Sequence, residues 1–228
     1  MTKNREKKMT LESSKILGGV GAILLLIGTI PFAAPYSGVI ALVGFVLVLV
    51  ALHGLADYYK ESGIFSNALY GFIAAIIGVV AAALAAVYVI FYTSILTNFL
   101  HEIYPSWNGS WSSLSGLTPT TSNITVKDVT PVIGAIFLVF AILWIFLIIS
   151  AFFNRRSLKA LATKTRVGLF STAGLLLIIG AILTIVLIGF VLMWIAVLLM
   201  VIAFFQISTQ PEQPVAPAAP PTQTPKPV

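Results

Sequence analysis

The chain has 228 residues, of which 59% are hydrophobic and only 9% are charged, whereas roughly 25% of the residues in soluble domains are charged. This composition excludes an ordinary water-soluble domain and favours helices that face lipid. The net charge of +6 does not indicate a nucleic-acid partner, because the basic residues are not gathered on any soluble domain. The chain has no cysteine, which excludes disulfides, thiolate metal sites and cysteine nucleophiles.

The N-terminal segment 1–14 is basic and precedes a long apolar block. Pro31 and Pro35 interrupt this block and predict a tight turn between two transmembrane helices, over about 16–32 and 37–55. The basic start is also typical of a signal peptide. The small residues before Pro35 make a poor cleavage site, so we expect the first helix to stay as an uncleaved anchor.

Two further apolar segments predict single transmembrane helices over 68–96 and 131–153. Residues 167–207 carry no charge, and one helix of that length would measure about 60 Å, twice the ~30 Å hydrocarbon core of a bilayer. The segment therefore predicts two helices, over 167–187 and 190–207. Because lipid leaves no partner for unpaired backbone amides, helices are the expected form. The predicted fold class is all-α, a polytopic membrane bundle of about six transmembrane helices.

The distribution of Lys and Arg predicts the orientation. With the N-terminus inside, the inner segments hold 12 of the 13 basic residues and the outer segments hold only Lys127. The positive-inside rule therefore predicts N-in/C-in topology in the cytoplasmic membrane. The outer loop 99–130 contains both N-x-S/T sequons of the chain, at Asn108 and Asn123, and these asparagines are predicted glycosylation sites.

The residues 208–228 form a proline-rich segment, which predicts a disordered cytoplasmic tail. Four of its prolines recur every three residues and would align on one face of a polyproline II helix. These are Pro211, Pro214, Pro217 and Pro220. The tail is either a solvated, semi-rigid spacer or a docking peptide for a cytoplasmic partner.

The apolar blocks contain no charged residue and no histidine over 16–52, 68–100, 129–154 and 167–211. Proton relays, voltage sensors and intramembrane metal sites need such residues inside the membrane. We therefore expect no catalytic residue, no cofactor and no metal.

Two pairs of polar residues lie at the predicted ends of helices. His53 and Asp57, four residues apart at an inner end, predict an interfacial hydrogen-bonded pair. With a third ligand such as Glu61 they would instead form a metal site. His101 and Glu102, at an outer end, are a weaker pair of the same kind.

Small residues recur every four positions in the segment 68–96, at Ala74, Gly78, Ala82 and Ala86. Such a face lets two helix backbones approach closely. It predicts packing within the bundle or, alternatively, a homo-oligomer interface.

The two end hairpins are similar in sequence, most clearly where residues 21–28 align with 173–180. A repeat of this kind would be parallel rather than inverted, because both copies begin on the inside. It would not divide six helices into two equal halves, which weakens a transporter interpretation.

Several segments resemble a known archaeal membrane family. They read LESSKILGGVG at 11–21, ALHGLADYY at 51–59 and GIFSNALYG at 63–71, and the chain resembles the family catalogued as domain of unknown function 996 over about 10–207. The resemblance implies an archaeal integral membrane protein with no established activity. It supplies no catalytic residues.

The leading functional hypothesis is a non-enzymatic scaffold or assembly protein in the lipid bilayer, because the apolar blocks hold no charge. The alternative is a transporter or channel for a neutral or apolar solute. That alternative requires the hydroxyl side chains of the helices to converge on one path. These are Thr29, Ser94, Ser150, Ser171, Thr172 and Thr184.

Overall fold

The computed structural model describes residues 10–29, 36–120 and 124–208. Most of segment 1–14, the prolines of the first turn, Asn123 and nearly all of the proline-rich tail lie outside these residues. In chain order the helices are α1 (Leu11–Gly28), α2 (Ser37–Tyr59), α3 (Ser62–Tyr92), α4 (Ile95–Ile103), the 3-10 helix η1 (Trp111–Gly116), α5 (Val126–Thr165), α6 (Gly168–Leu183), the 3-10 helix η2 (Thr184–Val186) and α7 (Ile188–Gln206).

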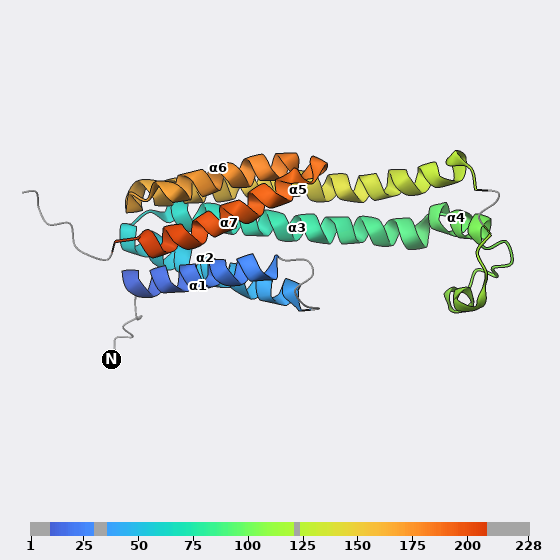
Figure 1. Ribbon diagram of the computed structural model, residues 1–228, viewed down its shortest axis with the longest axis horizontal. Coiled ribbons are helices and arrows are strands. Elements are labelled where there is room, and N and C mark those ends of the chain that lie inside the picture. Colours follow the sequence, from blue (N-terminus) through green and yellow to red (C-terminus); the bar gives the residue numbers. More distant parts are fainter. Residues whose placement is uncertain (1–9, 30–35, 121–123, 209–228) are drawn as a thin grey trace, which may run out of the picture.

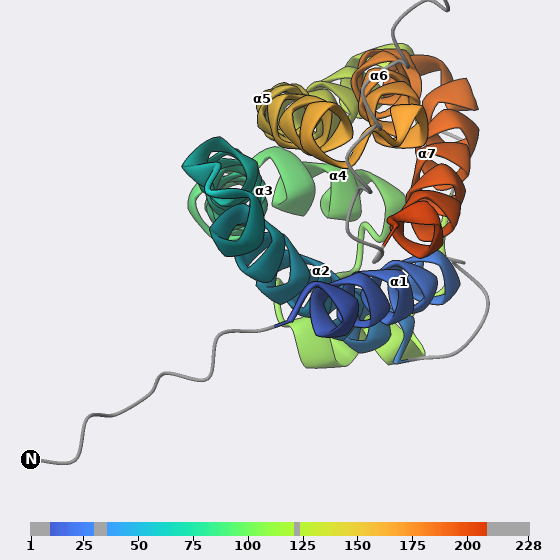
Figure 2. The ribbon, with the colours of Figure 1, turned by 90° about the vertical axis from the view of Figure 1, so that its left-hand side faces the viewer.

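The described residues form helices and no strand, and six of the helices are long and apolar enough to cross a membrane. The predicted all-α fold class with six such helices is therefore confirmed. The six helices contact one another in the cyclic order α1, α2, α3, α5, α6, α7 and back to α1. Figure 2, a view along the bundle, shows them arranged around a common centre.

One end of the bundle, here called the basic end, carries seven of the eight described Lys and Arg residues, while Lys127 lies at the other end, here called the α4 end. Figure 1 shows that α3 and α5 continue beyond the other four long helices to reach α4. The basic-end residues are Lys15, Lys60, Arg155, Arg156, Lys159, Lys164 and Arg166.

The helices extend beyond the predicted spans at the basic end. The loop expected between spans 37–55 and 68–96 is a link of two residues, because α2 continues to Tyr59 and α3 begins at Ser62. Lys60 takes a left-handed conformation with φ of 52°, which reverses the chain at once. The prediction failed because it equated the end of the apolar segment with the end of the helix.

The basic segment after 131–153 is also helical rather than a loop, since α5 continues to Thr165. Its Arg, Lys, Ala and Leu residues favour helix, and both Leu158 and Leu161 are buried there. The outer loop 99–130 is partly ordered as well. It holds most of α4 and all of η1.

The hydrophobic core lies near the basic end. Its fully buried side chains include Leu55, Leu161, Phe170 and Phe204, and the rings of Phe170 and Phe204 meet edge to face with centroids 5.1 Å apart. Lys15 closes the ring of helices here, because its Nζ donates a 2.8 Å hydrogen bond to the carbonyl of Ile207 just after α7. The charge stabilises the carbonyl end of that helix.

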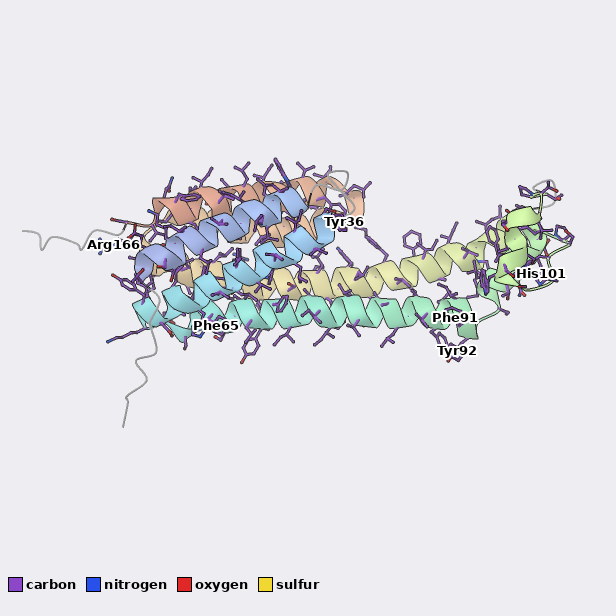
Figure 3. The ribbon with its side chains drawn as sticks, turned by 90° about the horizontal axis from the view of Figure 1, so that it is seen from below. Tyr36, Phe65, Phe91, Tyr92, His101 and Arg166 are labelled. Carbon is purple, nitrogen blue, oxygen red and sulfur yellow. The ribbon has the colours of Figure 1, made fainter. Side chains whose placement is uncertain are left out.

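The α6–α7 hairpin and the described parts of the α1–α2 hairpin end well before the α4 end. Phe140 of α5 lines the same cavity as Thr184 and Phe190 of the α6–α7 turn. Nine residues separate Phe140 from Pro131, which corresponds to about 13 Å of helix. Figure 3 shows that Tyr36, at the start of α2, also lies far from Tyr92 and His101 along the bundle.

Candidate functional sites

The small-residue face of α3 is divided by the structure. Ala74, Gly78 and Ala82 are buried, and a Cβ added at Gly78 would overlap the Cβ of Phe146 on α5. The face therefore serves close packing of α3 on α5 within one chain. Ala86 lies further along the helix and lines an open groove.

A polar patch on α5 interrupts the apolar interior of the ring. Asn154 donates from Nδ2 to the carbonyl of Ser150 at 3.0 Å, and the buried Ser157 hydroxyl donates to the carbonyl of Ile64 on α3 at 2.5 Å. These three side chains and Thr29 border a central cavity of about 260 Å³ with otherwise almost wholly apolar walls. Some of its lining residues, including Leu52 and Leu158, belong to the hydrophobic core.

The six candidate hydroxyls do not converge. Thr29 and Ser150 line the central cavity, whereas Ser94 lies in a polar pocket at the α4 end. The remaining three belong to α6 and its turn. Ser171 and Thr172 are exposed on the outer surface of the bundle, and Thr184 is buried and donates to the carbonyl of Gly180 in its own helix.

His53 and Asp57 lie close together on α2 but do not form the predicted hydrogen bond. His53 Nδ1 lies 3.6 Å from Asp57 Oδ2, and both side chains are more than half exposed. The third residue considered, Glu61, is instead paired with Lys164 at 3.1 Å. Over the described residues no group of three His, Cys, Asp or Glu side chains could hold a metal ion.

The α6–α7 turn is apolar and exposed, yet two carbonyls at its start accept side-chain hydrogen bonds. Leu187, with a left-handed φ of 63°, has 71% of its surface exposed, and its neighbours Val186 and Ile188 are also exposed. The Thr184 hydroxyl satisfies the Gly180 carbonyl. The indole of Trp144 on α5 satisfies the Ala181 carbonyl at 3.0 Å.

The hydrogen bonds at Gly180 and Ala181 mean that these two carbonyls do not need water as a partner. The last carbonyls of a helix have no partner within the helix and are usually solvated. Here side chains take the place of water at Gly180 and Ala181, and the N–H of Leu187 donates to the carbonyl of Thr184. The sequence gives one signal of this pairing, which was not predicted: the indole N–H of Trp144 needs a partner in an otherwise apolar segment.

The α4 end is a small layer of aromatic and polar residues. The buried Trp107 donates from Nε1 to the carbonyl of Ser110 at 2.7 Å, and its ring contacts His101 and Trp111. Asn108 is exposed. Its Oδ1 accepts hydrogen bonds from the Ser110 N–H and the Ser113 hydroxyl.

Two adjoining cavities lie where α3, α4 and α5 meet at this end. The larger is an apolar groove of about 470 Å³ between α3 and α5, lined by Ala86, Ile90, Ala135 and Ile136 among others. The second, of about 400 Å³, is half polar, and Ile95 lines both. Its polar and charged lining residues are Ser94, Asn98, His101, Glu102, Lys127 and Asp128.

Asp128 of this polar pocket lies before the apolar segment of α5. It forms a capping box, in which its carboxylate accepts from the N–H and the hydroxyl of Thr125 at 2.8 and 2.6 Å. These hydrogen bonds hold the pKa of Asp128 below its ordinary value. Asp128 is therefore a carboxylate at neutral pH.

These features define an all-helical protein with six helices able to cross a membrane. The chain belongs to the family described as "Protein of unknown function (DUF996)", whose profile matches residues 40–198. It is also similar to an uncharacterized protein, MJ1644, from Methanocaldococcus jannaschii, with 29% identity over 201 residues that cover 88% of this chain and 94% of the relative. No solved structure matches the chain. The family resemblance identified from the sequence is confirmed.

Proposed function

We propose that this protein is a non-enzymatic scaffold of the cytoplasmic membrane that inserts unequally into the two leaflets. The basic end faces the cytoplasm and the α4 end faces outward, as the positive-inside rule favours. Six helices then occupy the inner leaflet. Among the described long helices, only α3 and α5 continue through the outer leaflet to its surface.

The observation that carries this proposal is the α6–α7 turn. Its exposed apolar side chains favour lipid over water, and its carbonyls at Gly180 and Ala181 are satisfied by Thr184 and Trp144. In hydrocarbon an unpaired carbonyl costs several kcal/mol. The helix rise places this turn about 13 Å short of Pro131. Its exposed surface is apolar and these two carbonyls are paired. Such a turn suits the interior of the outer leaflet.

The depth of this turn can be tested with a charge. Placing Lys at a helix centre in the membrane costs about 2.5–3.5 kcal/mol on insertion scales, so Leu187→Lys should reduce the folded yield strongly. Val126→Lys is the matched control, because Val126 is exposed at the α4 end, outside the apolar segment. Equal tolerance of both variants would place the turn in water and overturn the proposed insertion.

Single cysteines test the orientation, because the natural chain contains none. Lys60→Cys should react with a membrane-impermeant maleimide only after cells are opened, while Ser112→Cys should react in intact cells. Leu187→Cys should react in neither case. The reverse pattern for Lys60 and Ser112 would contradict the N-in topology.

A scaffold with more helices in one leaflet should bend the bilayer. Reconstitution into vesicles at rising protein density should produce smaller or tubular vesicles by electron cryomicroscopy. The scattering of the candidate hydroxyls supports this role over transport of a neutral solute. Solute flux through vesicles of unchanged shape would reverse that choice.

A further inference from the structure

The two adjoining cavities at the α4 end have the layout of a site for an amphiphile. The apolar groove runs between α3 and α5 in the segment where the short hairpins no longer cover these helices. The polar pocket adjoins it, with Ile95 in both linings and Pro131 at the first turn of the apolar segment of α5. An apolar chain in the groove would therefore place its polar end in the pocket.

The polar pocket supplies both signs of charge. Lys127 offers an ammonium group, while Glu102 and Asp128 offer carboxylates. Neither Glu102 nor Lys127 forms an ion pair with any described part of the chain. Asp128 Oδ2 accepts both bonds from Thr125, which fixes the position of this carboxylate in the pocket lining.

The groove alone cannot select a ligand in a membrane, because lipid tails gain little by moving from one apolar surface to another. Selection must come from the polar pocket. A phosphate suits Lys127, and a protonated amine suits the carboxylates of Glu102 and Asp128. An anionic headgroup without an amine could place its phosphate beside Lys127, but it would bring no positive charge to the two carboxylates.

We propose that the groove and the polar pocket together bind one bilayer phospholipid whose headgroup carries a phosphate and a primary ammonium group. Lys127 contacts the phosphate, Glu102 and Asp128 contact the ammonium, and one hydrocarbon chain lies along Ala86 and Ala135. The inference rests on the membrane placement proposed above but not on the scaffold role.

Native mass spectrometry of the full chain, purified in detergent and exchanged into mixed micelles, tests this site. The micelles contain phosphatidylethanolamine or phosphatidylglycerol. We expect one phosphatidylethanolamine to be retained, with at least a tenfold preference over phosphatidylglycerol. Glu102→Gln combined with Lys127→Gln should reduce this preference to twofold or less.

Ala86→Phe should fill the groove and lower lipid retention at least tenfold. Ala83→Phe, on an exposed position of the same helix, is the matched control and should retain lipid as the natural chain does. Equal retention of the two lipids by the natural chain, equal effects of the two Phe variants, or a mass of two chains without lipid would overturn the proposal. If Ala86→Phe fails to fold, the exposed Glu102 and Lys127 variants decide.

If the protein localises to membranes and bends vesicles but retains no lipid, only the proposed lipid site is overturned. If it neither localises to membranes nor retains lipid, the membrane placement on which the two proposals depend is contradicted.

Discussion

The indole nitrogen of Trp144 donates a 3.0 Å hydrogen bond to the carbonyl of Ala181, and so attaches the end of the α6–α7 hairpin to α5. The bond satisfies a carbonyl that the last turn of α6 leaves without a helical partner. It also fixes how far the hairpin reaches along α5, because Trp144 lies well inside the apolar segment rather than at its outer end.

Trp144→Phe should therefore destabilise the protein while keeping an aromatic ring in place. We expect a loss of about 1 kcal/mol, since one hydrogen bond is removed and the Ala181 carbonyl is left unpaired. Thermal unfolding in detergent, followed by circular dichroism, measures the change. Trp194→Phe, at an exposed position of α7, is the control. Equal stability of the two variants would show that the bond does not hold the hairpin.

Gly78→Leu tests whether the small-residue face packs within one chain. Phe146 leaves no room for a side chain at Gly78, so α3 and α5 would have to separate, and the loss should reach about 3 kcal/mol or more. Ala83→Leu is the control on an exposed position of the same helix. The expected result is unfolded or aggregated protein in size-exclusion chromatography. A folded variant that changes only from oligomer to monomer would indicate an interface between chains.

The sequence predicted this fold well where the thickness of the bilayer limits the length of a helix. A segment of more than 40 residues without charge must divide, and the α6–α7 connection, residues 184–187, directly precedes the predicted break at Ile188 and Gly189. Hydropathy could not predict the helix ends at the basic end. Leu158 and Leu161 belong to the core, although charged residues surround them in sequence.

The candidate sites were harder to predict for a related reason. The spacing of His53 and Asp57 is local and brings His53 Nδ1 to 3.6 Å from Asp57 Oδ2, which is too long for the predicted hydrogen bond. The partner of Glu61 is Lys164, more than 100 residues away, and nothing in the spacing indicates it. The polar pocket likewise combines α4 with the start of α5. Such a site appears only when the chain is folded.

Ser157→Ala removes the buried hydrogen bond between α5 and the carbonyl of Ile64 on α3. A net loss of about 1 kcal/mol is expected, because the buried hydroxyl is lost and the Ile64 carbonyl loses this hydrogen bond. Thr163→Ala is a suitable control, since the Thr163 hydroxyl only bonds to the Lys159 carbonyl of its own helix. A smaller loss for Ser157→Ala than for Thr163→Ala would contradict this account.

Lys15→Met should loosen the contact between α1 and the end of α7. Lys15 Nζ donates to the Ile207 carbonyl at 2.8 Å, and a cation at the carbonyl end of a helix contributes about 0.3–1 kcal/mol. Hydrogen exchange at the amides of residues 204–207 should become faster in the variant. Lys159→Met removes an exposed charge from the same end and should leave these amides unchanged. Equal exchange in both variants would mean that the contact does not order α7.

Asn108 is placed to carry a glycan if the α4 end faces outward. Its side-chain oxygen accepts from the Ser110 N–H at 2.9 Å and from the Ser113 hydroxyl at 2.8 Å, so the amide nitrogen, which is the atom that becomes glycosylated, points away from these partners. Glycosidase treatment of protein from its native host should increase gel mobility, and Asn108→Gln should remove part or all of that shift. Asn123→Gln, the second sequon, separates the contributions of the two sites. If glycosidase leaves the mobility of the natural chain unchanged, neither asparagine is glycosylated. If the shift is retained in Asn108→Gln and lost in Asn123→Gln, the glycan lies on the second sequon alone.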